Sequence, residues 1–239
     1  MRLYDELAPW YRLIDPVSDH ENEATEIRDA LREHVAHEQP TLLELGAGAG
    51  NNAHFLKRDF QCTLVDTSEA MLGLSREINP DCEHIAGDMR TLRLGREFDA
   101  VLVHDAVVYM TSVRQLEAAA ATAFVHTRPD GAALFAPDYV RDSFEEEATL
   151  HEGRDGSRAM RCLEWVWDPD PTDDVYRVDY AFLLREDSEV RQVHDVHLEG
   201  FFSRSLWENV LSAVGYEVRR IRRSLPQGET DEVFLCRRP

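Results

Sequence analysis

The sequence predicts an α/β fold built on a mostly parallel sheet, with an antiparallel β-meander inserted late in the chain. Three observations support this prediction. An apolar run at 41–45 leads directly into a glycine-rich turn at 46–50 and then a helix. Strand-like and helix-like segments alternate as far as residue 136, the order that gives parallel strands. From residue 160 onward, three runs alternate polar and apolar residues, which is the period of antiparallel strands.

The segment before the first strand is predicted to be helical. Apolar residues recur at helical spacing over residues 3–14, although Pro9 limits this part to short pieces. Ser18 or Asp19 is a suitable N-cap for a longer helix that runs to about His37. We therefore expect two helical pieces ahead of the sheet.

The rest of the core follows the alternation of strands and helices, each bounded by turn residues. The expected elements are strand 62–65, helix 68–78, strand 83–86, strand 98–103, helix 113–126 (ended by 129–131) and strand 132–136.

The residue pattern changes in the last hundred residues, where the alternation of strands and helices stops. Residues 142–157 are acidic and polar, and the run at 145–147 is interpreted as a solvated helix face. The strands of the meander, the next helix and the closing antiparallel pair are expected at 160–167, 175–184, 190–198, 204–214, 216–223 and 232–237, with the last pair joined around Gln227-Gly228. The last pair would complete a seven-stranded sheet whose last strand is antiparallel.

Composition narrows the classes of partner. Lysine and arginine total 26 against 46 aspartates and glutamates, a formal net charge of −20, which would repel nucleic acid and anionic membranes. No apolar run approaches the roughly 20 residues of a membrane helix, and the charged N-terminus lacks the apolar segment of a signal peptide. The four cysteines are widely scattered, and the ten histidines show no metal-binding spacing. We therefore expect a cytoplasmic protein with reduced thiols, no metal site and no nucleic-acid or membrane partner.

The glycine-rich turn predicts a nucleotide or nucleoside site. Glycine allows a sharp turn and close approach of a ligand, and the helix that follows offers unpaired N–H groups. The dinucleotide fingerprint requires a glycine at position 51, where Asn51 stands. The pattern here is E-x-G-x-G-x-G, from Glu44 to Gly50.

Two carboxylates follow later strands of the Rossmann-like sheet. Asp66 ends the second strand, where a carboxylate can accept hydrogen bonds from both ribose hydroxyls, although helix capping is an alternative. Asp88 follows the third strand and can accept from an adenine amine, while the Met89 N–H meets a ring nitrogen. Met71 can pack on the adenine or belong to the core.

These blocks together resemble the class I S-adenosylmethionine (SAM) methyltransferases. The resemblance covers E-L-G-A-G-A-G, L-V-D-T-S-E-A-M-L, I-A-G-D-M-R, F-D-A-V-L-V-H-D-A-V-V-Y-M and R-P-D-G-A-A-L-F, in family order. It implies that the glycines flank the methionine part of SAM, that Asp66 binds the ribose, and that His104 lies near the methyl group. The cofactor-binding residues so implied are Glu44, Gly46, Gly48, Gly50, Asp66, Thr67, Met71, Asp88, Met89 and His104. The product would be S-adenosylhomocysteine.

A narrower resemblance is to the nucleotide-sugar amine N,N-dimethyltransferases. It is carried by Y-D-E-L-A-P-W-Y, G-D-M-R-T-L-R-L-G-R-E-F and D-V-H-L-E-G-F-F-S-R-S-L-W. It implies three parts: a SAM-binding core with an N-terminal helical lid (1–137), an inserted β subdomain over the acceptor pocket (138–200), and the completion of the core (201–239). The chain departs from that family at 104–109, H-D-A-V-V-Y, where small or hydroxylated residues are more usual.

Candidate residues for catalysis follow from the chemistry of methyl transfer. An amine must be neutral to attack, so a nearby imidazole or carboxylate is needed to take its proton. Catalytic candidates are His104, His197 and Tyr11; acceptor-binding candidates are Tyr11, Asp105, Tyr109 and Trp165. Three of these have structural alternatives: His197 facing solvent, Tyr11 in the core, and Trp165 filling a seam between subdomains.

We therefore predict methyl transfer from SAM to a small-molecule acceptor, with an amine nitrogen favoured. An O- or C-methyltransferase acting on a natural product is one alternative, and a SAM-binding regulator without turnover is another. A hydride-transferring dehydrogenase is disfavoured by Asn51 and by the antiparallel finish of the sheet. The protein is expected to be a monomer or a homodimer.

Overall fold

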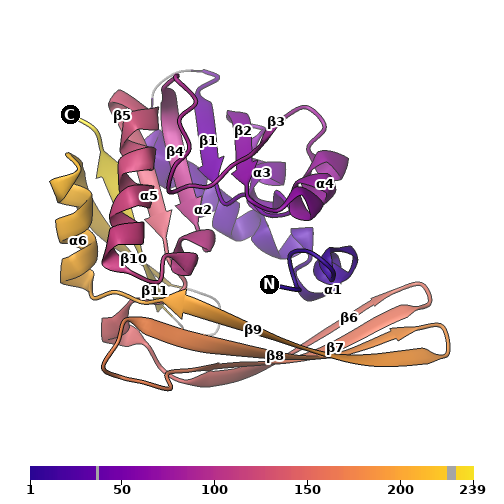
Figure 1. The fold of residues 1–239 in the computed structure, drawn as a ribbon. Helices are drawn as coiled ribbons and strands as arrows, with labels where there is room; N and C mark the ends of the chain where they lie inside the picture. Colours follow the sequence, from indigo (N-terminus) through magenta and orange to yellow (C-terminus); the bar gives the residue numbers. More distant parts are fainter. Residues whose placement is uncertain (36–37, 225–229) are drawn as a thin grey trace.

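The core of the computed structural model, which describes residues 1–35, 38–224 and 230–239, is a seven-stranded sheet in the order β10-β11-β5-β4-β1-β2-β3 (Figure 1). Its strands are β1 (Thr41–Leu45), β2 (Gln61–Asp66), β3 (Glu83–Ala86), β4 (Phe98–His104), β5 (Thr127–Ala136), β10 (Glu217–Ser224) and β11 (Thr230–Arg237). β11 runs antiparallel to both its neighbours, β5 and β10, and the other pairings are parallel. This confirms the predicted parallel sheet with an antiparallel last strand.

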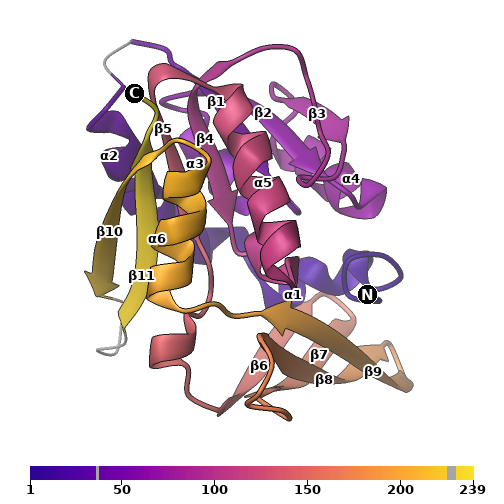
Figure 2. The same cartoon turned by 60° about the vertical axis from the view of Figure 1, so that its left-hand side comes forward.

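The central strands are apolar because helices cover both faces of the sheet (Figure 2). Every residue of β4 is buried. One face packs against α5 and α6, the other against α2 and α3. The helices are α1 (Tyr11–Ile14), α2 (Glu21–Arg32), α3 (Asn51–Leu56), α4 (Glu69–Ile78), α5 (Val113–His126) and α6 (Arg204–Ala213). None of the helices in the described ranges is long and apolar enough to cross a membrane.

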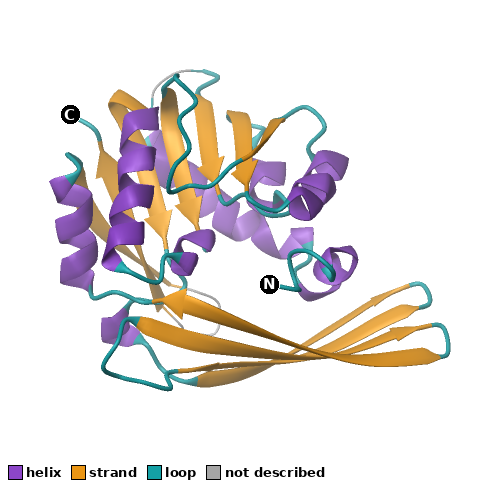
Figure 3. Ribbon diagram, viewed as in Figure 1, coloured by secondary structure: helices purple, strands orange, loops and turns teal. Residues whose placement is uncertain are grey.

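A second sheet lies across the carboxyl ends of the parallel strands (Figure 3). Its antiparallel strands, in spatial order, are β6 (Glu147–Asp155), β7 (Arg158–Trp167), β8 (Val175–Glu186) and β9 (Glu189–Gly200). The inner face of this sheet buries Phe182 and Val178 against Leu3, Leu7 and other residues of the N-terminal segment. We call this four-stranded sheet the roof. The N-terminal segment therefore lies between the roof and the core.

Three predictions about elements are corrected. Residues 145–147 were expected to form a solvated helix face, and no strand was predicted at 142–157. Instead β6 begins at Glu147 as an edge strand whose residues are nearly all exposed, so its sequence lacks an apolar face. Ser18 and Asp19 lie in a 3₁₀ turn (Val17–His20), and α2 begins only at Glu21. β5 begins at Thr127, so 129–131 belong to a strand. His37 and Gln227-Gly228 lie outside the described residues.

Candidate active site

The glycine-rich turn has the backbone that its sequence predicts. Gly46 and Gly50 have φ of 82° and 72°, and a Cβ at Gly46 would lie 2.3 Å from Ala106 Cβ. A Cβ at Gly50 would lie 2.2 Å from Ser75 Oγ, because Gly50 packs against α4. Gly50 does not line the cavity described next. Gly50 is the N-cap residue of α3, and its left-handed backbone starts that helix.

A cavity of about 910 Å³ opens between the glycine turn, the carboxyl ends of the strands, the N-terminal segment and the roof. Twelve of the predicted site residues line it: Tyr11, Glu44, Gly46, Gly48, Asp66, Thr67, Met71, Asp88, Met89, His104, Asp105 and Tyr109. The structure thus brings the sequence motifs together around one space.

Asp66 and Asp88 stand at the cofactor end of the cavity. Asp66 accepts the N–H groups of Gly48 and Ser68, each at 2.8 Å, which fixes its carboxylate at the end of β2; burial raises the pKa of Asp66. Asp88 instead pairs with Arg90, which donates its backbone N–H (2.8 Å) and its guanidinium, and this lowers the pKa of Asp88. Asp88 was predicted to accept a hydrogen bond from an adenine amine. In the structure its carboxylate oxygens accept hydrogen bonds from Arg90.

The fit to the amino-acid end of SAM can be tested on buried polar atoms. Within the described residues, Glu44 Oε2, Asn51 Oδ1 and Asn52 Oδ1 are buried acceptors with no hydrogen-bond partner. All three residues line the cavity beside the glycine turn. Burial raises the pKa of Glu44 to about 8. Buried acceptors need donors, and an α-ammonium group supplies three. The residues therefore fit SAM, with Asn51 and Asn52 as contacts that the motifs did not single out.

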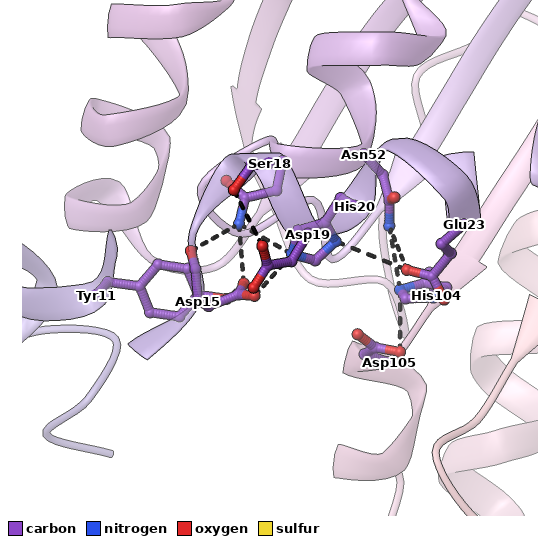
Figure 4. Close-up of polar contacts among 10 residues, drawn as sticks. Tyr11, Asp15, Ser18, Asp19, His20, Glu23, Asn52, His104 and Asp105 are labelled. Atoms are coloured by element: carbon purple, nitrogen blue, oxygen red, sulfur yellow. Dashed lines mark hydrogen bonds and ion pairs between the residues drawn. The ribbon is translucent and has the colours of Figure 1, made fainter. Parts of the chain in front are cut away.

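A network of polar contacts ties the N-terminal segment to the core (Figure 4). The Tyr11 hydroxyl donates to Asp15 at 2.7 Å, and the other Asp15 oxygen contacts His20 Nε2 at 2.7 Å. Asn51 Nδ2 donates to Asp15 at 2.9 Å. Burial lowers the pKa of His20, but its hydrogen bonds to Asp15 and Glu23 outweigh this and raise it to about 10. The segment is therefore held onto α3 by a charged cluster.

His104 sits between two carboxylates in the same network (Figure 4). Its Nε2 lies 2.8 Å from Glu23 Oε1, and its Nδ1 lies 3.0 Å from Asp105 Oδ1. Burial works against the charged ring, but Asp105 and Glu23 raise the pKa of His104 well above its ordinary value. A carboxylate oxygen near each ring nitrogen thus favours the charged form of His104 as a partner of Asp105. His104 was expected to be a base, and this geometry does not leave a nitrogen free to act as one.

The roof end of the cavity is rich in hydroxyls and carboxylates. Its polar lining comes from the N-terminal segment, from the loops after β4 and β5, and from the inner face of the roof. These residues are Tyr4, Tyr11, Asp105, Tyr109, Asp138, His151, Glu164, Tyr180 and Glu199. Asp138, Glu164 and Glu199 were not predicted. Asp138 and Glu164 belong to no motif, and Glu199 lies in the D-V-H-L-E-G-F-F block without having been singled out there. Only the alternation of β7 and β9 could have indicated that Glu164 and Glu199 face inward.

Two predicted residues lie away from the cavity. His197 was predicted to be catalytic, with a solvent-facing position as the alternative. It is instead fully buried behind Tyr109, with its Nδ1 2.9 Å from the Tyr109 hydroxyl. Its Nε2 contacts Asp195 at 3.1 Å. Trp165 was expected to bind the acceptor, but it lies on the outer face of the roof, 48% exposed, and its Nε1 donates to Glu146. The pleat of β7 explains this, because Glu164 takes the inward position.

Comparison with known proteins agrees with this geometry. Residues 42–131 match the family described as methyltransferase domain. The chain is 30% identical over 205 residues to the dTDP-3-amino-3,4,6-trideoxy-alpha-D-glucopyranose N,N-dimethyltransferase of Streptomyces venezuelae, covering 84% of each chain. It is 25% identical over 222 residues to the dTDP-3-amino-3,6-dideoxy-alpha-D-glucopyranose N,N-dimethyltransferase of Streptomyces fradiae, covering 89% of this chain and 84% of that one.

Solved structures extend the likeness to the whole chain, roof included. Streptomyces venezuelae DesVI superposes with a TM-score of 0.84 at 25% identity, covering 97% of this chain and 96% of its own. SAM-bound CalS10, an amino pentose methyltransferase from Micromonospora echinaspora, has a TM-score of 0.78 at 25% identity, covering 92% and 91%. The chain therefore belongs to the class I SAM-dependent methyltransferases, among the relatives of the nucleotide-sugar amine N,N-dimethyltransferases.

Proposed function

We propose that this methyltransferase methylates the amine nitrogen of an amino sugar. The observation that carries the proposal is the charge at the roof end of the cavity, where Asp105, Asp138 and Glu199 meet tyrosine hydroxyls. Carboxylates attract an ammonium group, and hydroxyls suit the polar ring of a sugar. The Streptomyces relatives, named as N,N-dimethyltransferases of dTDP-3-amino sugars, support the same class of acceptor.

The residues at the other end have roles in holding SAM, which supplies an electrophilic methyl group on its sulfonium. Glu44, Asn51 and Asn52 would accept hydrogen bonds from the α-ammonium, because their acceptor atoms are buried beside the glycine turn. Asp66, held by two backbone N–H groups, would accept from the ribose hydroxyls. The adenine would lie near Met71 and Met89, which also line the cavity.

An O- or C-methyltransferase for an apolar ring is not favoured. Such an acceptor would need apolar walls, because unpaired carboxylates facing a hydrocarbon ring lose their hydration without compensation. The net charge of −20 further supports a small molecule, and not a nucleic acid, as the partner. A cytoplasmic location, the state as a monomer or homodimer, and the three-part division of the chain remain predictions from the sequence.

The test combines cofactor binding with an acceptor screen. Calorimetry should show that S-adenosylhomocysteine binds and NAD does not. Asp66→Ala should weaken that binding about ten- to a hundredfold, since it removes a charged hydrogen-bonding group. Asp81→Ala is the matched control, because Asp81 is an exposed carboxylate that pairs with Lys57 away from this cavity.

The screen then offers SAM with amino sugars and their nucleotide conjugates, with the corresponding hydroxy sugars as the comparison. Mass spectrometry should detect methyl groups on the amines alone. Methylation of the hydroxy sugars, or of neither set despite tight binding of S-adenosylhomocysteine, would refute the assignment of the acceptor.

A further inference from the structure

Asp105 is held in a backbone conformation that side chains rarely adopt. Its φ is 35° and its ψ is −59°, and its N–H donates to Ala136 O at 2.9 Å. Such strain persists where the surrounding structure fixes the residue, and it gathers at functional sites. The Asp105 side chain is 54% exposed, and the residue lines the cavity. The turn after β4 therefore presents this carboxylate to the space where the acceptor would bind.

Two further carboxylates approach the same point from other elements. Asp138 follows β5, lines the cavity and hydrogen-bonds through its side chain to Asp105. Glu199 is a buried inward-facing residue of β9, and it too lines the cavity. Three acids that lie far apart in the sequence thus meet at one end of the cavity, where His104 contacts Asp105 and His197 lies 3.6 Å from Glu199.

This clustering raises the affinity of Asp138 for a proton. Burial raises the pKa of Asp138 well above its ordinary value, and the negative charges of Asp105 and Glu199 add to the shift, while His104 opposes it. Like charges in contact cannot both ionise easily, so Asp138 binds a proton more tightly than an isolated aspartate does. This raised pKa brings Asp138 closer to the proton affinity of an amine.

His104 holds one member of the pair. Its Nδ1 contacts Asp105, and Glu23 from α2 contacts its other nitrogen. Other charged groups near this corner are Glu44 from β1, His20 from the turn before α2, and His197 of β9, whose Nδ1 lies 3.6 Å from Glu199. The His104 ring therefore stabilises negative charge on the Asp105 carboxylate.

We propose that Asp105 and Asp138 together take the proton that the acceptor's ammonium group must lose, and that Glu23 and His104 are positioning residues that hold the Asp105 carboxylate. This inference rests on the proposed function, since it requires an amine acceptor. Neither Asp138 nor Glu23 belongs to a sequence motif, and the pair lies outside the cofactor-binding residues.

An ammonium group that binds beside Asp105 and Asp138 displaces the proton held on Asp138 to the solvent, because its positive charge favours the ionised carboxylates. It then passes one of its own protons to the pair, which leaves a neutral amine and a pair with one proton. The nitrogen lone pair then forms a bond to the methyl carbon as the carbon–sulfur bond breaks, and its electrons stay on the sulfur. The product is a methylated ammonium ion and a thioether. One proton per turnover leaves the pair for the solvent.

The pH profile of kcat/KM for an amine found in the screen tests this role. Asp138→Asn should cost about a hundredfold near neutral pH, the range of general base catalysis. The loss should shrink as the pH approaches the solution pKa of the acceptor, where the amine is already neutral. Asp138→Glu should recover part of the activity. An equal loss at every pH would overturn the proposal, because it would indicate a structural role alone.

Glu23→Gln tests the positioning residues. The glutamine can still hydrogen-bond to His104 but no longer stabilises its charge, so a new alkaline fall in kcat/KM should appear as His104 loses its proton. Glu26→Gln, on the exposed face of the same helix, is the matched control and should retain the wild-type profile. A wild-type profile for Glu23→Gln would contradict the role of Glu23.

A measurement without turnover separates this inference from the proposed function. NMR titration of the complex with S-adenosylhomocysteine should show a carboxyl that titrates far above the ordinary aspartate range and that disappears in Asp138→Asn. It should also show that the pKa of His104 falls in Glu23→Gln. An ordinary titration of Asp138 would overturn the inference even if amines are methylated. Failure of the amine screen would instead overturn the proposed function.

Discussion

Gly50 shows how one residue shapes the glycine-rich turn through its backbone and its packing. Its φ of 72° strains any residue with a Cβ, which would also lie 2.2 Å from Ser75 Oγ and 2.4 Å from Asn79 Nδ2. We expect Gly50→Ala to destabilise the fold by about 2–4 kcal/mol, the combined effect of strain and overpacking. Urea unfolding measures this, with Gly73→Ala as the control.

Gly73 lies within α4 and has no atom within 4 Å of an added Cβ. Its replacement by alanine should stabilise the protein by about 0.5–1 kcal/mol, because alanine is the better helix former. Similar effects for the two variants would mean that the position of Gly50 carries no special constraint.

At the scale of single residues, the cofactor-binding half of the site can be predicted from the sequence, whereas the acceptor-binding half cannot. Glu44 and Asp66 can be located because each lies in a short motif at or beside a strand end, and parallel strands bring their carboxyl ends to one edge. Asp138 and Glu199 reach the cavity only through the placement of a loop and of the roof. A sequence gives no distance between such segments, so these acids could not be selected from the 46 available.

Charge pairing, too, is a property of the folded chain. His104 was identified correctly as a residue of the cavity, but its role depends on Glu23, 81 positions earlier. That contact turns a candidate base into a cation. The prediction that His197 lies in the site failed for a related reason. A strand of alternating polar residues does not reveal that its inward face is buried beneath another segment.

Among the elements, the N-terminal segment couples the two halves of the molecule. The Leu3 N–H donates to Asp195 of the roof at 2.8 Å, and the Tyr4 carbonyl accepts from Ser68 Oγ of the core. The Tyr4 hydroxyl also contacts Tyr109 at 2.8 Å. The N-terminal segment, for which the sequence predicts a helical lid, therefore connects the roof to the core through contacts on both sides.

The charged cluster at the end of this segment makes stability depend on pH. His20 titrates near 6.5 when unfolded and near 10 when folded, so the folded state binds its proton more tightly. Its contribution to stability is fully present below pH 6.5 and is lost as the pH rises through 10. We expect the free energy of unfolding to fall more steeply between these values for the wild type than for His20→Asn. Parallel curves from chemical denaturation would contradict the assignment.

The elements that sequence patterns misplace are those whose partners lie far along the chain. β6 has no apolar periodicity because its inner face meets α1 and the cavity and its outer face meets solvent. Trp165 has the size of an acceptor-binding residue, yet the pleat of β7 turns it outward. By contrast β4, buried on both faces, and α5, with a complete apolar stripe, were placed within one residue.

At the scale of the whole molecule, the net charge of −20 opposes folding through repulsion between like charges. Salt screens this repulsion, since the Debye length falls from about 14 Å at 0.05 M to about 4 Å at 0.5 M. We therefore expect Tm at pH 7.5 to rise with sodium chloride over this range, as measured by calorimetry. Near the isoelectric point of about 4.8 the net charge vanishes and the rise should disappear. A fall of Tm with salt at pH 7.5 would mean that the many surface ion pairs, and not the excess of acid, dominate the electrostatic energy.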